Sequence, residues 1–170
     1  MGSNTSSLID NINKISFFDG FSKTEKEKLI EKIGMFEKYE KKGLTIFLDG
    51  EKGDSMYVIL EGAISIIRKS FKGDKEKLVS IAKLKKGSVF GEISLLSNHN
   101  RTTGAITDSP LVIVMVINKK TLESFDLGIQ KLFHTQMIST LIHRLNDMNE
   151  KYKNLIDRNV YLEKVKVQNL

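Results

Sequence analysis

The sequence predicts an α+β protein that is mainly β, built as an eight-stranded β-roll or jelly roll with helices before it and one long helix after it. Between residues 37 and 117, short runs of β-branched and aromatic residues alternate with glycine turns, a pattern typical of small sandwiches and rolls. On either side, apolar residues recur at helical spacing among Lys and Glu. We therefore expect a helical segment over residues 1–36, the β-roll over 37–117, and a hinge with the long helix over 118–170.

The N-terminal segment shows helical spacing of apolar residues from Leu8 onward. Ser22 is followed three residues later by Glu25, which is the spacing of a capping box. This spacing predicts a helix over residues 23–34. Three aromatic residues lie just before it and should pack onto the roll; they are Phe17, Phe18 and Phe21.

The β region divides into short segments that are separated by glycine turns. Eight strands in about 80 residues favour a small roll rather than a larger sheet. The predicted strands cover residues 36–41, 45–48, 55–60, 63–69, 77–84, 88–90, 103–107 and 111–117.

A short helical element over residues 121–125 leads into a long predicted helix over residues 129–166, which at 1.5 Å per residue would be about 57 Å long. Apolar residues on this helix follow the spacing of a coiled-coil a/d seam with one polar position. The repeated positions are Leu141, Met148, Leu155 and Leu162, with Leu145, Tyr152 and the polar Asn159 each four residues after one of the first three. We expect a parallel homodimer through this helix; a frayed single helix and a link to a partner protein are the alternatives.

The composition narrows the class of protein. The net charge is +6, from 27 Lys and Arg against 21 Asp and Glu, and along the sequence the basic residues are interleaved with acidic ones without aromatic partners. We therefore expect no nucleic-acid partner. The absence of Cys excludes disulfides and thiolate metal sites. No apolar stretch approaches the roughly 18 residues of a membrane span, and no secretory signal pattern is present, so we expect a cytoplasmic protein without a membrane partner. The start Met1 to Ser6 matches the N-myristoylation pattern, although it equally resembles starts added for expression.

The run from Phe90 to Thr102 carries the most specific chemistry in the chain. Gly91 has no side chain, so a ligand can approach the backbone closely. Glu92 can accept a hydrogen bond from a ribose hydroxyl, and it begins a short apolar turn of helix whose free N–H groups favour an anion. Arg101 offers a planar, permanently charged fork to a phosphate, and Thr102 adds a hydroxyl.

This run closely resembles the phosphate-binding cassette of cyclic nucleotide-binding domains, the sensor modules of catabolite-activator-like regulators, cyclic-nucleotide-dependent kinases and gated channels. The family's upstream glycine and aromatic pattern is present as well. It is supplied by Gly43, Ile46, Phe47, Gly50, Gly53, Asp54, Tyr57, Val58, Ile59, Gly62 and Gly87. The resemblance covers roughly residues 15–155, and we read these glycines as turn residues that position the pocket.

The resemblance implies a ligand, cAMP or cGMP, that is bound within a cassette over residues 90–103. It implies that Arg101 and Thr102 bind the phosphate, that Glu92 binds the ribose 2′-hydroxyl, and that backbone groups of Gly91, Ile93 and Ser94 hold the sugar-phosphate. By rough alignment with the bacterial sensors, Asn149 on the long helix could reach the purine edge. Thr102 does not decide between the two bases.

The chain departs from the family pattern at Thr103 and Gly104, where an Ala and then a Thr or Ser are usual, and at Asn100, which replaces a frequent proline. These changes keep a second reading open, in which a degenerate module of the same fold serves as a dimerisation scaffold without nucleotide. We find no nucleophile with a base, no Gly-Lys-Ser/Thr phosphate loop and no metal-ligand spacing among the histidines. We therefore expect a non-enzymatic sensor without a cofactor, which passes its signal to an effector protein.

Overall fold

The computed structural model describes residues 2–32, 34–72, 75–97 and 99–168. The chain forms two compact units, Met1–Leu132 and Phe133–Leu170. The first unit contains the N-terminal helices, the β-sheets and the start of the last helix, and the second consists of the rest of that helix.

Three short helical elements precede the sheets: α1 (Gly2–Asn13), the 3-10 helix η1 (Ser16–Phe18) and α2 (Lys23–Glu31). The capping box is confirmed, because the Glu25 backbone N–H donates to Ser22 Oγ at 3.3 Å while the Ser22 backbone N–H donates to Glu25 Oε2 at 2.7 Å. Helix α1 begins at Gly2, well before the apolar pattern that starts at Leu8. The sequence pattern missed its first turns because they are polar and carry no apolar periodicity. The predicted aromatic cluster is buried and makes edge-to-face contacts; its members are Phe17, Phe18 and Phe21.

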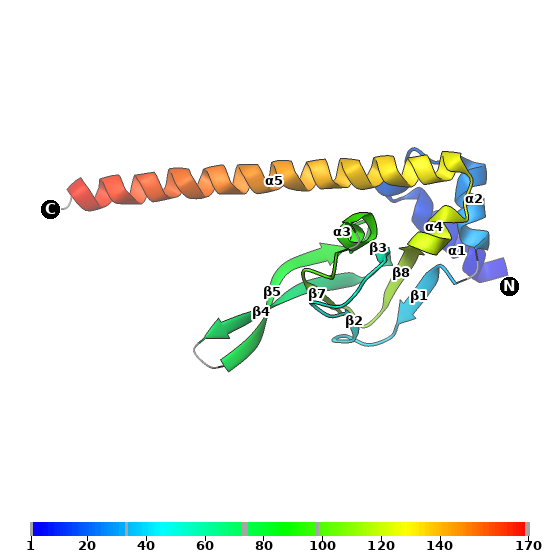
Figure 1. Ribbon diagram of the computed structural model, residues 1–170, viewed down its shortest axis with the longest axis horizontal. Helices are drawn as coiled ribbons and strands as arrows, with labels where there is room; N and C mark the ends of the chain where they lie inside the picture. The colour runs from blue at the N-terminus through cyan, green and yellow to red at the C-terminus, as the bar shows by residue number, and fades with distance from the viewer. Residues whose placement is uncertain (1, 33, 73–74, 98, 169–170) are drawn as a thin grey trace. The chain divides into compact units, whose positions relative to one another are not determined.

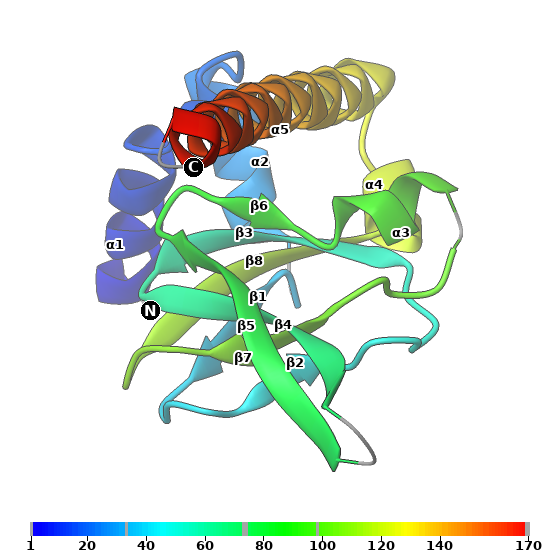
Figure 2. The ribbon, with the colours of Figure 1, turned by 90° about the vertical axis from the view of Figure 1, so that its left-hand side faces the viewer.

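The predicted eight-stranded roll is confirmed in the part of the chain that the structure describes. The strands are β1 (Phe36–Tyr39), β2 (Thr45–Phe47), β3 (Ser55–Glu61), β4 (Ala63–Lys72), β5 (Lys75–Lys85), β6 (Val89–Phe90), β7 (Gly104–Thr107) and β8 (Val112–Asn118). They form two four-stranded antiparallel sheets, one in the order β1-β8-β3-β6 and the other in the order β2-β7-β4-β5 (Figures 1 and 2). The two sheets enclose one hydrophobic core, whose buried members are Phe47, Tyr57, Ile59, Ile64, Phe90, Ala105, Val112 and Val114.

The β4–β5 hairpin is longer than the sequence pattern predicts. Strand β4 runs to Lys72 rather than to residue 69, and β5 begins at Lys75 rather than at residue 77. The added residues are largely polar, so the apolar alternation on which the prediction depended stops before the strands do. Figure 1 shows this hairpin reaching away from the roll, on the side opposite to α1 and α2.

Three helices accompany the second half of the roll. Helix α3 (Glu92–Ser97) follows β6, and α4 (Lys119–Glu123) follows β8 with Asn118 as its N-cap. Helix α5 (Leu127–Gln168) begins two residues earlier than predicted because Asp126 caps it, accepting a hydrogen bond from the Ile129 N–H at 3.1 Å. None of the described helices combines the length and the apolar character that a membrane span requires.

Candidate functional site

Arg101 lies between α3 and β7 and is fixed to the loop that joins β2 to β3. Its backbone N–H donates to the Glu51 carbonyl at 2.7 Å, and its own carbonyl accepts from the Gly50 N–H at 2.8 Å. Only 5% of the residue is exposed. The loop therefore turns the arginine side chain inward, where a permanent positive charge is costly unless it has partners.

The guanidinium finds two partners in the backbone. Nη1 of Arg101 donates to the carbonyl of Ser55 at 2.7 Å and to the carbonyl of Gly91 at 2.9 Å. Neither oxygen carries a formal charge. The Nε–H group of the same side chain is buried and has no hydrogen-bond partner among the residues that the structure describes. A buried donor on a cation that lacks a partner is a position at which an anion would be stabilised.

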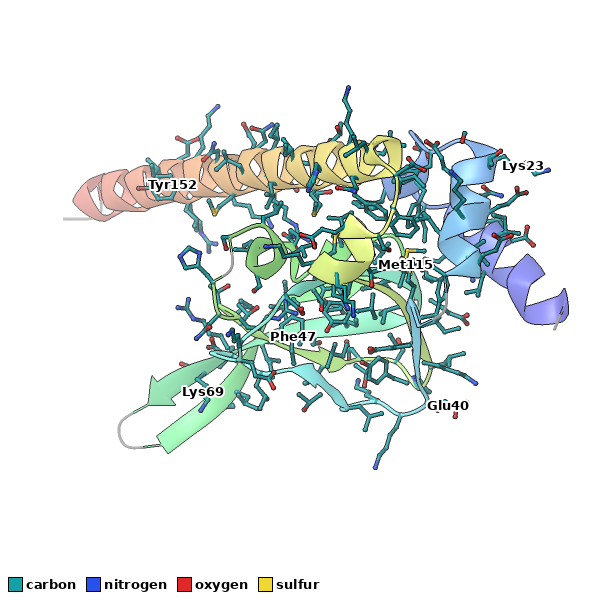
Figure 3. The ribbon with its side chains drawn as sticks, turned by 45° about the vertical axis from the view of Figure 1, so that its right-hand side comes forward. Lys23, Glu40, Phe47, Lys69, Met115 and Tyr152 are labelled. Carbon is teal, nitrogen blue, oxygen red and sulfur yellow. The ribbon has the colours of Figure 1, made fainter. Side chains whose placement is uncertain are left out.

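Aromatic rings support the guanidinium from within the roll. The Cζ atom of Arg101 lies 4.2 Å from the ring centroid of Phe47, the core residue labelled in Figure 3, and 5.6 Å from that of Tyr57. Tyr57 in turn stacks on Phe90, with centroids 4.9 Å apart and an interplanar angle of 16°. A cation over an aromatic face is attracted by the ring quadrupole, most strongly where water is excluded. Burial raises the pKa of the Tyr57 hydroxyl, and the nearby charge of Arg101 opposes this rise without cancelling it.

Two glycines leave the space that the guanidinium occupies. A Cβ atom at Gly53 would lie 2.4 Å from Nε of Arg101, and a Cβ atom at Gly91 would lie 2.7 Å from Nη1. Gly91 also adopts a positive φ of 75°, which only glycine adopts readily. Gly53 has no such backbone requirement. It therefore has a role beyond the turn that the sequence assigned to it, because any side chain there would meet the arginine.

The remaining cassette residues differ in exposure. Glu92 and Ser94, in the first turn of α3, are 1% and 3% exposed, whereas Ile93 between them is 47% exposed. Thr102 is exposed whereas its neighbour Arg101 is buried, so the two residues that the sequence paired differ in their access to solvent. Asn149 is exposed and belongs to the second unit.

Gly104 has a structural explanation that the sequence did not provide. A Cβ atom there would lie 2.9 Å from Cγ1 of Ile67, its pairing partner on β4. Ile67 is 5% exposed, so it occupies the space that a side chain at position 104 would need. The departure from the family pattern at this position is therefore matched by close packing between β7 and β4.

Sequence reasoning missed the part that Phe47, Tyr57 and Gly53 play around the arginine. All three stand in the quoted motif, yet the motif assigned them only to strands and a turn. The β3–β6 register places Tyr57 opposite Phe90, and the packing of the two sheets brings Phe47 of β2 against both rings. Arg101 then lies over Phe47 and Tyr57. Local spacing does not contain that information.

The arrangement is suited to binding an anion and shows no constellation for bond-breaking chemistry. Within the described residues, no group of three or more His, Cys, Asp or Glu side chains could hold a metal ion. The nearest histidine in the sequence, His99, lies exposed on the loop before Arg101. The site thus combines a buried cation, two close-approach glycines and an apolar floor.

Comparisons with known proteins identify the family of the chain. The profile of the family described as "Cyclic nucleotide-binding domain" matches residues 37–126. The cGMP-dependent protein kinase egl-4 of Caenorhabditis briggsae is 26% identical over 166 residues, which is 91% of this chain and 22% of that kinase. The cAMP-dependent protein kinase type I-alpha regulatory subunit of Mesocricetus auratus is 30% identical over 108 residues, covering 64% of this chain and 60% of that subunit. The chain therefore spans less than two thirds of either relative.

Among solved structures, a cyclic nucleotide-binding domain from Methylobacillus flagellatus superposes with a TM-score of 0.69 at 19% identity, over 87% of this chain and 82% of that one. This likeness concerns the fold. Together with the profile match, which spans more than half of the chain, it identifies the class of protein: the chain belongs to the cyclic nucleotide-binding domain family. The resemblance seen in the sequence is confirmed.

Proposed function

We propose that this chain is a sensor that binds a cyclic nucleotide, cAMP or cGMP, at Arg101 and passes the binding event to a partner protein through its C-terminal helix. The buried Nε–H group of Arg101 is the observation that carries this proposal. Nη1 already bonds two carbonyls, whereas Nε–H is left in the buried interior without a partner among the described residues. A phosphate oxygen that reaches Nε–H as the surrounding residues adjust would complete the coordination of the guanidinium.

The other cassette residues take complementary roles in this proposal. Glu92 accepts a hydrogen bond from the ribose 2′-hydroxyl. Backbone groups of Gly91, Ile93 and Ser94 hold the sugar-phosphate, and Thr102 turns its hydroxyl to the phosphate. The burial of Glu92 and Ser94 supports a fixed first turn of α3, whereas the exposure of Thr102 means that it would have to reorient on binding.

Helix α5 supplies the base contact and the dimer in this proposal. Asn149 reaches the purine edge, and two copies of the helix pair in parallel. The helix is 42 residues long, or about 63 Å at 1.5 Å per residue. Seven apolar side chains between residues 138 and 156 of this helix are about half or more exposed, which supports a partner surface; they are Ile138, Ile142, Leu145, Met148, Tyr152, Leu155 and Ile156.

Signal transfer then depends on the hinge at residues 118–130. A ligand shifts α5 only to the extent that it binds one hinge position more tightly than the other. We propose no catalysis and no cofactor, a cytoplasmic location, and no nucleic-acid or membrane partner. The two curated relatives are named for cGMP and for cAMP, so both ligands enter the test.

The second candidate is a degenerate module that dimerises without nucleotide, for which Thr103 and Gly104 are the motivating residues. The close packing of Gly104 against Ile67 gives this glycine a reason that is unrelated to loss of the site. The two candidates differ in one measurable property, which is affinity for a cyclic nucleotide.

Calorimetric titration of the ligand-free chain with cAMP and with cGMP tests the proposal. We expect micromolar or tighter binding of one of them and its loss in Arg101→Ala. Because Arg101 is buried, Glu92→Gln serves as a second variant, and circular dichroism and thermal melting establish that each variant is folded. Absence of heat with both ligands, on folded protein, would replace the sensor by the scaffold.

A further inference from the structure

The net charge of the chain is concentrated in one hairpin. Residues 63–86, which form β4, β5 and the turn after them, contain eight basic residues and two acidic ones, a net charge of +6. The other 146 residues contain nineteen of each sign and are neutral. The basic residues are Arg68, Lys69, Lys72, Lys75, Lys77, Lys83, Lys85 and Lys86. The excess positive charge thus lies in one continuous stretch of sequence, which the fold arranges as two adjacent strands.

The same hairpin exposes apolar side chains and an open edge. Leu78, Val79 and Ile81 on β5 are 56%, 40% and 55% exposed. Strand β5 is the last strand of its sheet, paired on one side only, with β4. Its outer backbone N–H and C=O groups therefore face outward within the described structure, which is the usual template for adding a strand. Lys69, labelled in Figure 3, marks the distal half of this hairpin, where it extends beyond the roll.

We propose that the outer edge of β5 is a docking site for an acidic, extended segment of a partner protein, which pairs with it as an added strand. Lys83 already pairs with Asp108, and Lys86 donates to Asn11. Carboxylates on the incoming strand would therefore meet the other lysines of β5, and its apolar residues would cover Leu78 and Ile81. Lysines on an edge repel a second copy of the same basic strand. The edge is therefore selective, because like charges across a strand pair are destabilising and opposite charges are stabilising.

Two other acidic partners fit these features less well. Insertion into an anionic bilayer would place the unpaired backbone groups of β5 in hydrocarbon, where open sheet edges do not occur. Nucleic acid would satisfy the lysines, but aliphatic side chains offer its bases neither stacking nor hydrogen bonds. An acidic β-strand is the partner that matches the charge, the apolar side chains and the open edge together.

The proposal is independent of nucleotide binding and is tested on the full chain by fluorescence anisotropy. The probe is a short labelled peptide in which Glu alternates with Val. Its controls are a peptide of the same charge with proline at the Val positions, phosphatidylserine-containing vesicles and duplex DNA. We expect saturable binding of the alternating peptide that weakens with salt, slower hydrogen exchange of β5 amides in the complex, and much weaker binding of every control.

Charge-reversal variants locate the site. Strand β5 carries one extra residue between Ser80 and Ala82, so Lys77 and Lys85 lie on opposite faces and an alternating peptide opposes only one of them with Glu. Lys77→Glu should therefore weaken binding of a peptide in the matching register about threefold, from one attractive cross-strand pair becoming repulsive. The matched control, Lys119→Glu, changes net charge equally at an exposed position on α4 and should bind as the parent does. Leu78→Ser should also weaken binding. The proposal is overturned if the alternating peptide does not bind, or if the proline peptide binds equally well. It is also overturned if vesicles or DNA bind more tightly than the alternating peptide, or if the control variant loses as much peptide affinity as the β5 variant.

Discussion

Gly53 lies so close to Arg101 that a side chain has no room there, and this gives a quantitative prediction for Gly53→Ala. The new Cβ would lie 2.4 Å from Nε and 2.6 Å from Cζ of the arginine, whereas ordinary contact begins near 3.4 Å. The guanidinium must therefore move by about 1 Å, which would stretch the 2.7 and 2.9 Å hydrogen bonds to Ser55 and Gly91 beyond useful length.

The upper limit of the cost follows from those two bonds. Hydrogen bonds that involve a charged group contribute about 1.5–3 kcal/mol each, so losing both costs at most about 3–6 kcal/mol. A displaced guanidinium regains bonds to water, and we expect about 1–3 kcal/mol in the free energy of unfolding, measured by urea denaturation. If the arginine binds phosphate from its present position, affinity for the cyclic nucleotide should fall at least about tenfold, since about 1.4 kcal/mol corresponds to that factor.

The matched control for this prediction is Gly104→Ala. Its Cβ would meet Cγ1 of Ile67 at 2.9 Å and Cδ1 at 3.2 Å, which is a comparable clash that does not involve Arg101. We expect this variant to lose stability while each folded molecule keeps its affinity. Wild-type stability and affinity in Gly53→Ala, or an equal loss of affinity in Gly104→Ala, would refute the placement of the guanidinium.

Three further predictions concern other parts of the chain. Hydrogen bonds from Lys42 and Lys83 lower the pKa of Asp108 from 3.8 to about 2. A carboxyl whose pKa is lowered by folding adds stability above pH 3.8, and this stability is lost as the pH falls toward 2. The variant Asp108→Asn should therefore flatten that part of the pH profile of stability measured by urea denaturation. Asp126 caps α5, and Asp126→Ala should lower the thermal midpoint more than Asp126→Asn, which keeps an oxygen for the Ile129 N–H; equal melting would contradict the cap. Leu145→Glu with Leu155→Glu should turn the proposed dimer into a monomer in light scattering, whereas a monomeric parent chain would end that proposal.

Much of the fold could be predicted because its signals are local. The capping box at Ser22 and Glu25 depends on three-residue spacing, and the strands depend on alternation between glycine turns. The prediction failed where local signals end, as at the polar first turns of α1 and the basic tip of the β4–β5 hairpin. Both are regular structure that continues after the apolar pattern has stopped.

The candidate site was less accessible to the sequence because two facing sheets make it. Gly91, Glu92 and Arg101 stand in one recognisable run, but the residues that hold the guanidinium come from β2 in one sheet, β3 in the other, and the loop between them. The basic character of the hairpin is different, because residues 63–86 carry it in one continuous stretch of sequence. The structure adds that the two halves of this stretch pair as adjacent antiparallel strands.

The hydrogen bonds of Arg101 determine what a ligand would have to displace. If the phosphate bonded the same Nη1 donor, binding would exchange two internal hydrogen bonds for external ones, and the net gain would be small. Nε is buried, so a phosphate oxygen reaches it only after the residues around it move; it would then add a bond while Ser55 and Gly91 keep theirs. The Ser55 carbonyl lies at the start of β3, and the Gly91 carbonyl lies within the cassette, directly before α3. In the proposed sensor, an arginine that stays bonded to them while it takes the phosphate would transmit a shift of the ligand directly to the first turn of α3.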